Sequence, residues 1–274
     1  MHILGNSYIL KGDANERIPV MRYSIGTVIS IKKIGEGIFD LRVAEPGIAK
    51  DAKPGQFVCL YSDDGAHLLP RPISICEKDE ESVRLVFRIA GYGTKEFSEK
   101  KPGDTVRILG PIGNPYPEFA QNVIVVGGGI GIPPMLYLAR KCKEAGLKVT
   151  AVLGYRDKNT FLDEEFRAYG DVVIATDNGD LGVHGTVVDA IREKGLDVSL
   201  VCACGPMPML KGLSKYVLEK GGRCYVSLEE RMACGIGACL GCITKTKQVD
   251  GHSHVKNQRI CTEGPVFDAS ELDW

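Results

Sequence analysis

The sequence contains no long run of apolar residues. No stretch approaches the roughly 20 apolar residues that a membrane-spanning helix requires, so we predict no membrane span. Residues 1–6 carry neither a basic cluster nor the start of a long apolar core, so we also predict no secretory signal. The net charge at pH 7 is −1 and no basic run occurs, which argues against binding to nucleic acid.

The sequence also lacks a Ser/His/Asp arrangement or a pair of carboxylates that would suggest hydrolysis, so we predict no catalytic side chain beyond bound cofactors. Its ten cysteines are scattered and do not form the dense framework of a small disulfide-rich domain. Small buried thiols are expected where cysteines lie in apolar runs. Five cysteines do so: Cys59, Cys76, Cys142, Cys202 and Cys224. We therefore expect a reducing compartment and a cytoplasmic protein.

Four other cysteines have a spacing that indicates an iron–sulfur cluster. Cys234, Cys239 and Cys242 form a C-x4-C-x2-C pattern, and Cys261 follows 19 residues later. Plant-type ferredoxins hold a [2Fe–2S] cluster with this spacing. Glycines inside the run allow the tight turns that three thiolates on one loop require. Because such a cluster carries one electron at a time, the pattern predicts electron transfer.

A binding module held together by zinc is the alternative interpretation of the four cysteines. Structural zinc sites typically use paired C-x2-C or Cys/His motifs, and only one such cysteine pair is present. His252 and His254 could be zinc ligands, but they lie in a polar stretch that is typical of a solvated loop. Zinc would also leave the glycine-rich turns elsewhere unexplained.

The first half of the chain has the pattern of short strands. Residues 1–22 show no clear periodicity and are predicted to form an extension or an extra strand. Residues 23–117 are predicted to form a small antiparallel β-barrel, because β-branched or alternating runs are separated by turn clusters. The six expected strands are 27–31, 39–43, 56–60, 73–76, 83–88 and 105–109.

Residues 118–228 alternate between strand and helix patterns. This alternation predicts an α/β domain with a parallel sheet covered on both faces. The cysteine-rich segment, 229–274, is predicted to form a small C-terminal module. The expected strands are 123–126, 148–154, 172–175, 200–203 and 223–227, and the expected helices are 133–145, 161–169, 186–194 and 207–220.

Two motifs in the predicted barrel suit a flavin. In Arg71-Pro72-Ile73-Ser74 the guanidinium can pair with a phosphate and the Ser74 hydroxyl can bond a ring edge. In Gly91-Tyr92-Gly93-Thr94 two glycines precede a short helix, whose N-terminal N–H groups can bind an anion. Each motif also has a purely structural explanation as a turn next to a strand or helix.

Two further motifs follow strands of the predicted parallel sheet, whose carboxyl ends are where ligands bind in open α/β folds. Gly127, Gly128, Gly129 and Gly131 separate a strand from a helix and can hold a dinucleotide pyrophosphate, although they are not a regular G-x-G-x-x-G. Cys204-Gly205-Pro206 has the same position after a later strand. Cys204 could face a nicotinamide or be an inert thiol, and the sequence leaves both open.

The order of these motifs resembles the ferredoxin–NADP reductase superfamily, which joins an FAD-binding β-barrel to a pyridine-nucleotide domain. Within it, the runs 229–239 and 261–267 are similar to the electron transfer subunits of type B dihydroorotate dehydrogenase. The resemblance covers about residues 23–274. Leu240-Gly241 departs from the residue pair of many relatives, which concerns the surface that faces a partner rather than cluster ligation.

The resemblance implies three cofactor sites. NAD(H) would lie against Gly127, Gly128, Gly129, Gly131, Cys204, Gly205 and Pro206, and the [2Fe–2S] cluster on Cys234, Cys239, Cys242 and Cys261. FAD would be held by Arg71, Pro72, Ile73, Ser74, Arg88, Ile89, Ala90, Gly93 and Thr94. NADH would give a hydride to FAD, which releases electrons singly to the cluster.

By the same resemblance, the final acceptor is the FMN of a separate catalytic subunit that interconverts dihydroorotate and orotate in pyrimidine biosynthesis. The assembly would be a heterotetramer, and this chain would have no pyrimidine site. NAD is favoured over NADP on the resemblance alone. A reductase subunit that serves another partner, such as a hydrogenase or a bifurcating transhydrogenase, would show the same motifs.

Overall fold

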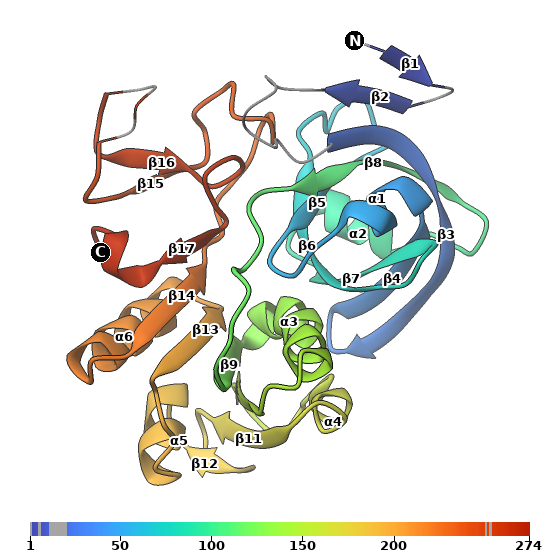
Figure 1. Ribbon diagram of the computed structural model, residues 1–274. Coiled ribbons are helices and arrows are strands. Elements are labelled where there is room, and N and C mark those ends of the chain that lie inside the picture. Colours follow the sequence, from blue (N-terminus) through green and yellow to red (C-terminus); the bar gives the residue numbers. More distant parts are fainter. Residues whose placement is uncertain (1, 5–6, 11–20, 250, 252–253) are drawn as a thin grey trace.

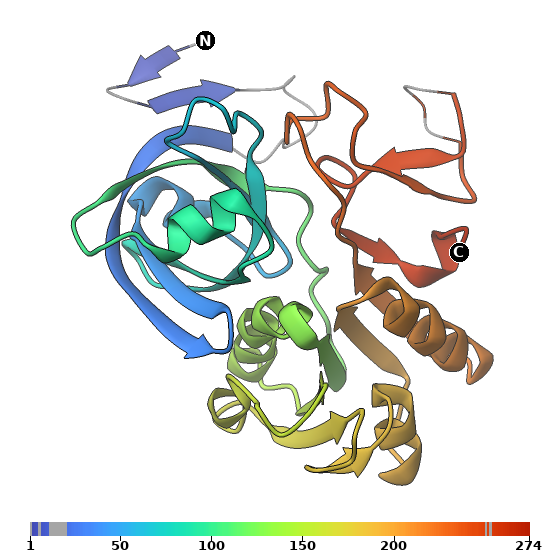
Figure 2. The same ribbon diagram turned by 180° about the vertical axis from the view of Figure 1, so that it is seen from behind.

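The computed structural model describes all of the chain except residues 1, 5–6, 11–20, 250 and 252–253. Three parts are visible in Figure 1: a barrel in blue to green, a helix-flanked sheet in green to orange, and a C-terminal module in orange to red. Seen from behind, the C-terminal module again lies beside both other parts (Figure 2). We call residues 229–274 the cysteine module.

The barrel consists of six antiparallel strands, as the sequence predicts. β3, β4, β7, β6, β5 and β8 pair in that order, and β8 returns to β3 and closes the sheet. Two short helices contribute Ile48 and Phe97 to the barrel core. The bounds are β3 Met21–Gly35, β4 Ile38–Ala44, α1 Pro46–Asp51, β5 Phe57–Tyr61, β6 Arg71–Lys78, β7 Ser82–Arg88, α2 Tyr92–Ser98 and β8 Thr105–Ile112.

A short hairpin precedes the barrel. β1 (His2–Leu4) pairs with β2 (Ser7–Leu10), and β2 pairs antiparallel with the first residues of β3. The hairpin therefore widens the barrel sheet at β3 (Figure 1). Residues 11–20, which belong to the predicted N-terminal extension, lie outside the described residues.

The second sheet is parallel apart from its last strand, β17. Its order is β12, β11, β10, β9, β13, β14 and β17. The strands are β9 Val123–Gly128, β10 Val149–Tyr155, β11 Asp171–Thr176, β12 Val183–His184, β13 Leu200–Cys204, β14 Arg223–Ser227 and β17 Val266–Asp268. The helices are η1 Gly129–Gly131, α3 Ile132–Glu144, α4 Asp163–Phe166, α5 Val187–Glu193 and α6 Met207–Glu219.

Helices cover both faces of this sheet, as the strand–helix alternation predicts. Val123 and Val125 of β9 pack with α3 on one face, whereas Ile124 and Val126 pack with α5 and α6 on the other. The predicted helix at 161–169 is shorter than expected and is a single turn. Leu162 has a left-handed φ of 65°, so the helix begins only after it.

The cysteine module is attached to both other parts of the molecule. It contributes β17, which pairs antiparallel with β14 at the edge of the parallel sheet. Its remaining described elements are the hairpin β15 (Ile243–Lys245) and β16 (Asn257–Arg259) and the short helix η2 (Ala269–Glu271).

A second attachment joins the module to the segment between barrel and sheet. The Asn114 amide donates a hydrogen bond of 2.5 Å to the Gly264 carbonyl oxygen, and Asn114 bridges to Pro265. Gly113 lies so close to Pro265 that an added Cβ would collide with the proline ring. None of the described helices is long and apolar enough to cross a membrane.

This close contact predicts that adding one methyl group at Gly113 destabilises the protein. Gly113→Ala should lower the free energy of unfolding by roughly 1–3 kcal/mol, because its φ of 82° strains any side chain. The collision with Pro265 should add to that loss. Urea denaturation would measure it.

Gly103→Ala is the matched control. Gly103 also has a left-handed φ, 94°, but an added Cβ would meet no atom within 4 Å. If both variants lose equal stability, the contact between Gly113 and Pro265 contributes nothing beyond backbone strain.

Candidate functional site

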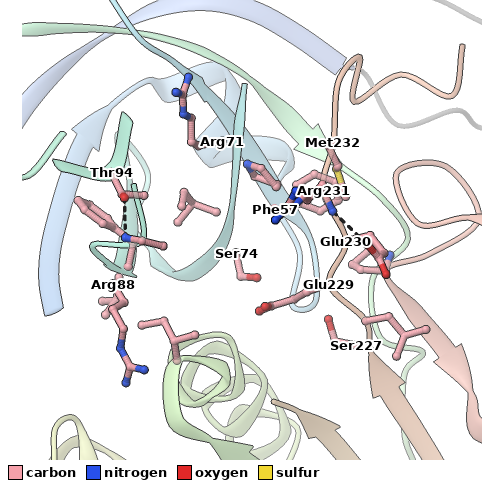
Figure 3. Close-up of a pocket in the computed structure, with 18 residues that line it drawn as sticks. Phe57, Arg71, Ser74, Arg88, Thr94, Ser227, Glu229, Glu230, Arg231 and Met232 are labelled. Atoms are coloured by element: carbon pink, nitrogen blue, oxygen red, sulfur yellow. Dashed lines mark hydrogen bonds between the residues drawn. The ribbon is translucent and has the colours of Figure 1, made fainter. Parts of the chain in front are cut away.

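A cavity of about 550 Å³ lies where the barrel, η1 and the start of the cysteine module meet (Figure 3). Strand β6 and the end of β7 bring most of the predicted flavin residues to its wall. These are Arg71, Pro72, Ile73, Ser74, Arg88, Ala90 and Thr94. Two other predicted residues, Ile89 and Gly93, do not line the cavity.

Arg71 is held at this cavity without a counterion. Its guanidinium donates hydrogen bonds to the carbonyl oxygens of His67, at 3.0 Å, and Leu69, at 2.5 Å. Among the described residues, no carboxylate lies within ion-pair distance of it. Gly93 packs directly against the Arg71 side chain and leaves no room for a Cβ. The pair therefore presents a positive charge that is free to bind an anion.

Thr94 shapes the turn beside Arg71. Its hydroxyl accepts hydrogen bonds from the amides of Ala90 and Gly91, at 2.9 and 3.1 Å, and donates to the Gly91 carbonyl oxygen at 3.0 Å. The backbone of the glycine motif is thus held in its turn by the hydrogen bonds of Thr94. Gly91 has an extended backbone, and an added Cβ there would meet no atom within 4 Å.

The opposite wall of the cavity was missed by sequence reasoning. It comes from the end of β14 and the start of the cysteine module, namely Ser227, Leu228, Glu229, Glu230, Arg231 and Met232, together with Pro265. Phe57, Val86 and Phe87 of the barrel and Ile130 of η1 complete the lining. Only the apolar character of Phe57 and Phe87 within predicted strands could have suggested a buried role for them.

Glu229 is the acidic group that projects into this cavity, between Ser74 and Ser227 (Figure 3). Glu229 is exposed, and its carboxyl faces the open cavity. Partial desolvation by the cavity wall raises the pKa of the Glu229 carboxyl above its usual range. The carboxyl is placed to bond a polar group of a ligand in the cavity.

The two glycine motifs of the parallel sheet meet beside η1. Cys204 at the end of β13 is in register with Gly127 at the end of β9. A Cβ on Gly131 would collide with the Cys204 carbonyl, and one on Gly128 would collide with the side chain of Met209. The glycines thus allow the two strand ends and α6 to approach each other closely, as the sequence indicates for a ligand site at strand ends.

The four cysteines of the predicted cluster meet as two pairs. The side chains of Cys234 and Cys239 interact, and so do those of Cys242 and Cys261. Cys242 and Cys261 are buried, whereas Cys239 is exposed. We call residues 234–242 the cysteine loop. Left-handed backbone at Gly235, Gly237 and Leu240 lets this loop turn around the sulfurs.

Backbone N–H groups point at the sulfurs. The amides of Ile236 and Gly241 lie 3.4 Å from Cys234 Sγ and Cys239 Sγ, respectively. The hydrogen bond from Cys261, with further backbone donors, lowers the pKa of Cys242 to about 6. Burial would raise the pKa of Cys234, but the amide of Ile236 and other donors lower it overall. The loop therefore favours the thiolate, the form of cysteine that binds iron, at Cys234 and Cys242, whereas the interaction with Cys242 raises the pKa of Cys261.

The zinc alternative gains no support from the histidines. His252 lies outside the described residues, and His254 is exposed. Within the part of the chain that the structure describes, no three Cys, His, Asp or Glu side chains are grouped as ligands of a single metal ion. The thiols are arranged two and two, which suits a cluster with two irons.

Comparisons with known proteins agree with this site. Residues 229–273 match the family model described as the iron-sulfur cluster binding domain of dihydroorotate dehydrogenase B. The chain is 38% identical over 261 residues to the "Dihydroorotate dehydrogenase B (NAD(+)), electron transfer subunit" of Geobacillus sp. (strain WCH70), covering 92% of this chain and 99% of that one. The same-named subunit of Geobacillus thermodenitrificans (strain NG80-2) is 40% identical over 254 residues, covering 90% and 96%.

A solved structure of an NADH-dependent reduced ferredoxin–NADP oxidoreductase, described in work on flavin-based electron bifurcation, is also similar. It has a TM-score of 0.82 and 32% identity, and the match covers 91% of this chain and 90% of that one. The predicted fold class and the resemblance stated from the motifs are therefore confirmed. The chain belongs to the family of electron transfer subunits of NAD(+)-dependent dihydroorotate dehydrogenase B.

Proposed function

We propose that this chain passes electrons between NAD(H), FAD and a [2Fe–2S] cluster, and from the cluster to the FMN of a separate dihydroorotate dehydrogenase catalytic subunit. One observation carries the proposal: three candidate sites adjoin one another in one body. The glycine turns and the cavity meet at Ile130 of η1, and the cavity wall continues along the chain into the four-cysteine loop. When bound, FAD supplies the conversion of a two-electron hydride into single electrons.

The barrel side of the cavity fits FAD. Arg71 would pair with the pyrophosphate, because its guanidinium is bonded only to carbonyl oxygens and is held in place by Gly93. Apolar side chains such as Phe57 and Ile73 would pack against the ring system and exclude water. Ser74 and the Glu229 carboxyl project into the cavity, where they would bond the polar edge of the ring.

The strand ends of the parallel sheet fit a nicotinamide nucleotide. Gly127, Gly128, Gly129 and Gly131 would let the pyrophosphate approach the backbone at the start of the 13-residue helix α3. Gly205 and Pro206 would line the same space from β13. Burial raises the pKa of the Cys204 thiol, so Cys204 would contribute shape rather than a thiolate.

The cysteine loop fits a [2Fe–2S] cluster. One iron would take the thiolates of Cys234 and Cys239, and the other would take those of Cys242 and Cys261, because these are the side chains that neighbour each other. The surrounding backbone N–H groups would stabilise the thiolates and tune the potential of the cluster.

The exposed side of the cysteine loop fits a partner surface. Cys239 is exposed there, and so are the apolar side chains of Ile236, 41% exposed, and Leu240, 46% exposed. The membership of this chain among electron transfer subunits implies a catalytic partner subunit. We propose that this partner binds FMN, forms a heterotetramer with this chain and covers the loop. The free buried thiols support a cytoplasmic location.

A second candidate function is favoured by one comparison. The similar solved structure belongs to an oxidoreductase studied for electron bifurcation, whose name includes NADH, reduced ferredoxin and NADP. A reductase of this build that serves a different partner would use the same three sites. Only the identity of the acceptor separates the two functions.

The first prediction concerns FAD. Gly93→Ala should displace Arg71 and weaken FAD binding by about tenfold or more, because a hydrogen bond to a charged group contributes roughly 1.5–3 kcal/mol. Flavin fluorescence during titration of the flavin-free chain would measure the affinity. Gly91→Ala, in the same turn but facing open space, should bind FAD far more tightly than Gly93→Ala. Equal affinities would contradict the role of Arg71.

The second prediction concerns the cluster. Cys242→Ala should abolish the visible absorbance and EPR signal of a [2Fe–2S] cluster and leave bound FAD in place. Cys224→Ala is the control, because Cys224 is equally buried but lies in β14 outside the loop. A Cys242→Ala protein with normal iron content would remove Cys242 from the ligand set, and a colourless wild type with one zinc would support the zinc alternative.

The third prediction tests the partner. The chain with FAD and cluster, mixed anaerobically with the FMN-containing catalytic subunit from the same cells, should oxidise NADH when orotate is added. Leu240→Glu should slow this reaction about fivefold or more, because losing a central interface side chain costs more than about 1 kcal/mol.

Leu218→Glu on α6 is the control, since Leu218 is also exposed, at 37%, but lies on a helix of the parallel-sheet part rather than in the cysteine loop. If NADH is not oxidised when orotate is added, although both cofactors are present, the electron acceptor is another protein. That result would favour the second candidate function.

A further inference from the structure

The flavin cavity and the cysteine loop are connected by two very short stretches of chain. Met232 lines the cavity, and Cys234, two residues later, is a proposed cluster ligand. Phe57 lines the cavity from β5, and Cys59, two residues later on the same strand, lies beneath the cysteine loop. Two residues of extended chain span about 7 Å, so the cavity and the loop are separated by a thin wall.

This wall is tightly packed. Met232 is 7% exposed, Phe57 3% and Cys59 is fully buried. All three belong to the same buried apolar cluster as Cys242 and Cys261. A Cβ on Gly235 would lie only 3.1 Å from Cys59 Sγ and 3.6 Å from Ile112, so the loop rests directly on β5 and β8.

The other walls of the cavity lead away from the cysteine loop. Val86 belongs to the core between the barrel and α3. Phe87 belongs to the core inside the barrel, and Ile73 packs against that core. The side made by Phe57, Leu228 and Met232 is thus the part of the lining that belongs to the same apolar cluster as Cys242 and Cys261.

We propose that Met232 is a positioning residue for electron transfer, which fills the gap between the flavin and the Cys234 side of the cluster. This inference rests on the proposed function. In the step concerned, the reduced flavin loses one electron, with release of a proton to solvent, and the oxidised cluster gains that electron. No bond to Met232 forms or breaks. Its side chain supplies packed atoms, through which electrons tunnel more readily than through a void.

The cysteine between the two sites adds to this wall. Cys59 is fully buried, and a Cβ on Gly235 would lie 3.1 Å from its sulfur. Cys59 therefore fills the space between β5 and the cysteine loop.

The test follows both cofactors after one addition of NADH. The wild-type chain and the variants Met232→Leu, Met232→Val and Met232→Ala, each loaded with FAD and cluster, would be mixed anaerobically with NADH. Flavin absorbance gives the rate of flavin reduction, and rapid-freeze EPR of the reduced cluster gives the rate of cluster reduction. The ratio of the second rate to the first should fall progressively from Leu to Val to Ala and be several-fold lower in Met232→Ala.

A readout without turnover accompanies this test. Electron transfer between the excited flavin and the nearby cluster shortens the fluorescence lifetime of bound FAD. The lifetime should therefore lengthen in the same order as the rate ratio falls. Met135→Ala is the control, because Met135 is fully buried in the core beside α3 and outside the wall. It should lower stability but leave the rate ratio and the lifetime unchanged.

The outcomes separate the two proposals. If Met232→Val and Met232→Ala keep the wild-type ratio and lifetime, the positioning role is overturned. If Met232→Ala cannot bind FAD or the cluster, the rate ratios and lifetimes of Met232→Leu and Met232→Val decide whether Met232 has the positioning role. If the wild-type chain binds FAD and the cluster but NADH reduces neither, the proposed function itself fails.

Discussion

The contact between the Gly113–Asn114 segment and Gly264–Pro265 is the constraint on which the arrangement of the three parts depends. It joins the segment that leaves the barrel to the segment that enters β17, and Pro265 also lines the cavity proposed to hold FAD. The barrel, the parallel sheet and the cysteine module therefore share one junction at the edge of the candidate site. A redox chain requires cofactors at fixed separations, and a rigid junction beside the central cavity provides this.

The elements of the fold could be predicted well from the sequence because their signals are local. Strand periodicity and turn residues gave the six barrel strands, and the strand–helix alternation gave the parallel sheet. The shortened helix α4 depended on Leu162, whose left-handed conformation has no signal in its residue type. The hairpin β1–β2 pairs with β3 in a segment for which the sequence predicts only an extension or an extra strand, because its residues show no clear periodicity.

The candidate site could be predicted in part. Arg71 and Ser74 lie in a motif, and the cysteines have a diagnostic spacing, so both were found from the sequence. The wall from Ser227 to Met232 was missed because its position depends on β14 reaching the barrel, a contact between segments far apart in the chain. Phe57 was also missed, since a phenylalanine in a strand has the same appearance whether it faces a core or a cofactor. Proximity between the cavity and the cysteine loop likewise arises only in three dimensions.

The pairing of β17 with β14 has a consequence for how the molecule is made. The last strand of the parallel sheet is synthesised after the cysteine loop, so the edge of β14 stays open until the loop has emerged. An open strand edge invites pairing with other chains. Closure of the parallel sheet therefore waits until the whole cysteine module has been synthesised, and until then β14 offers an open edge.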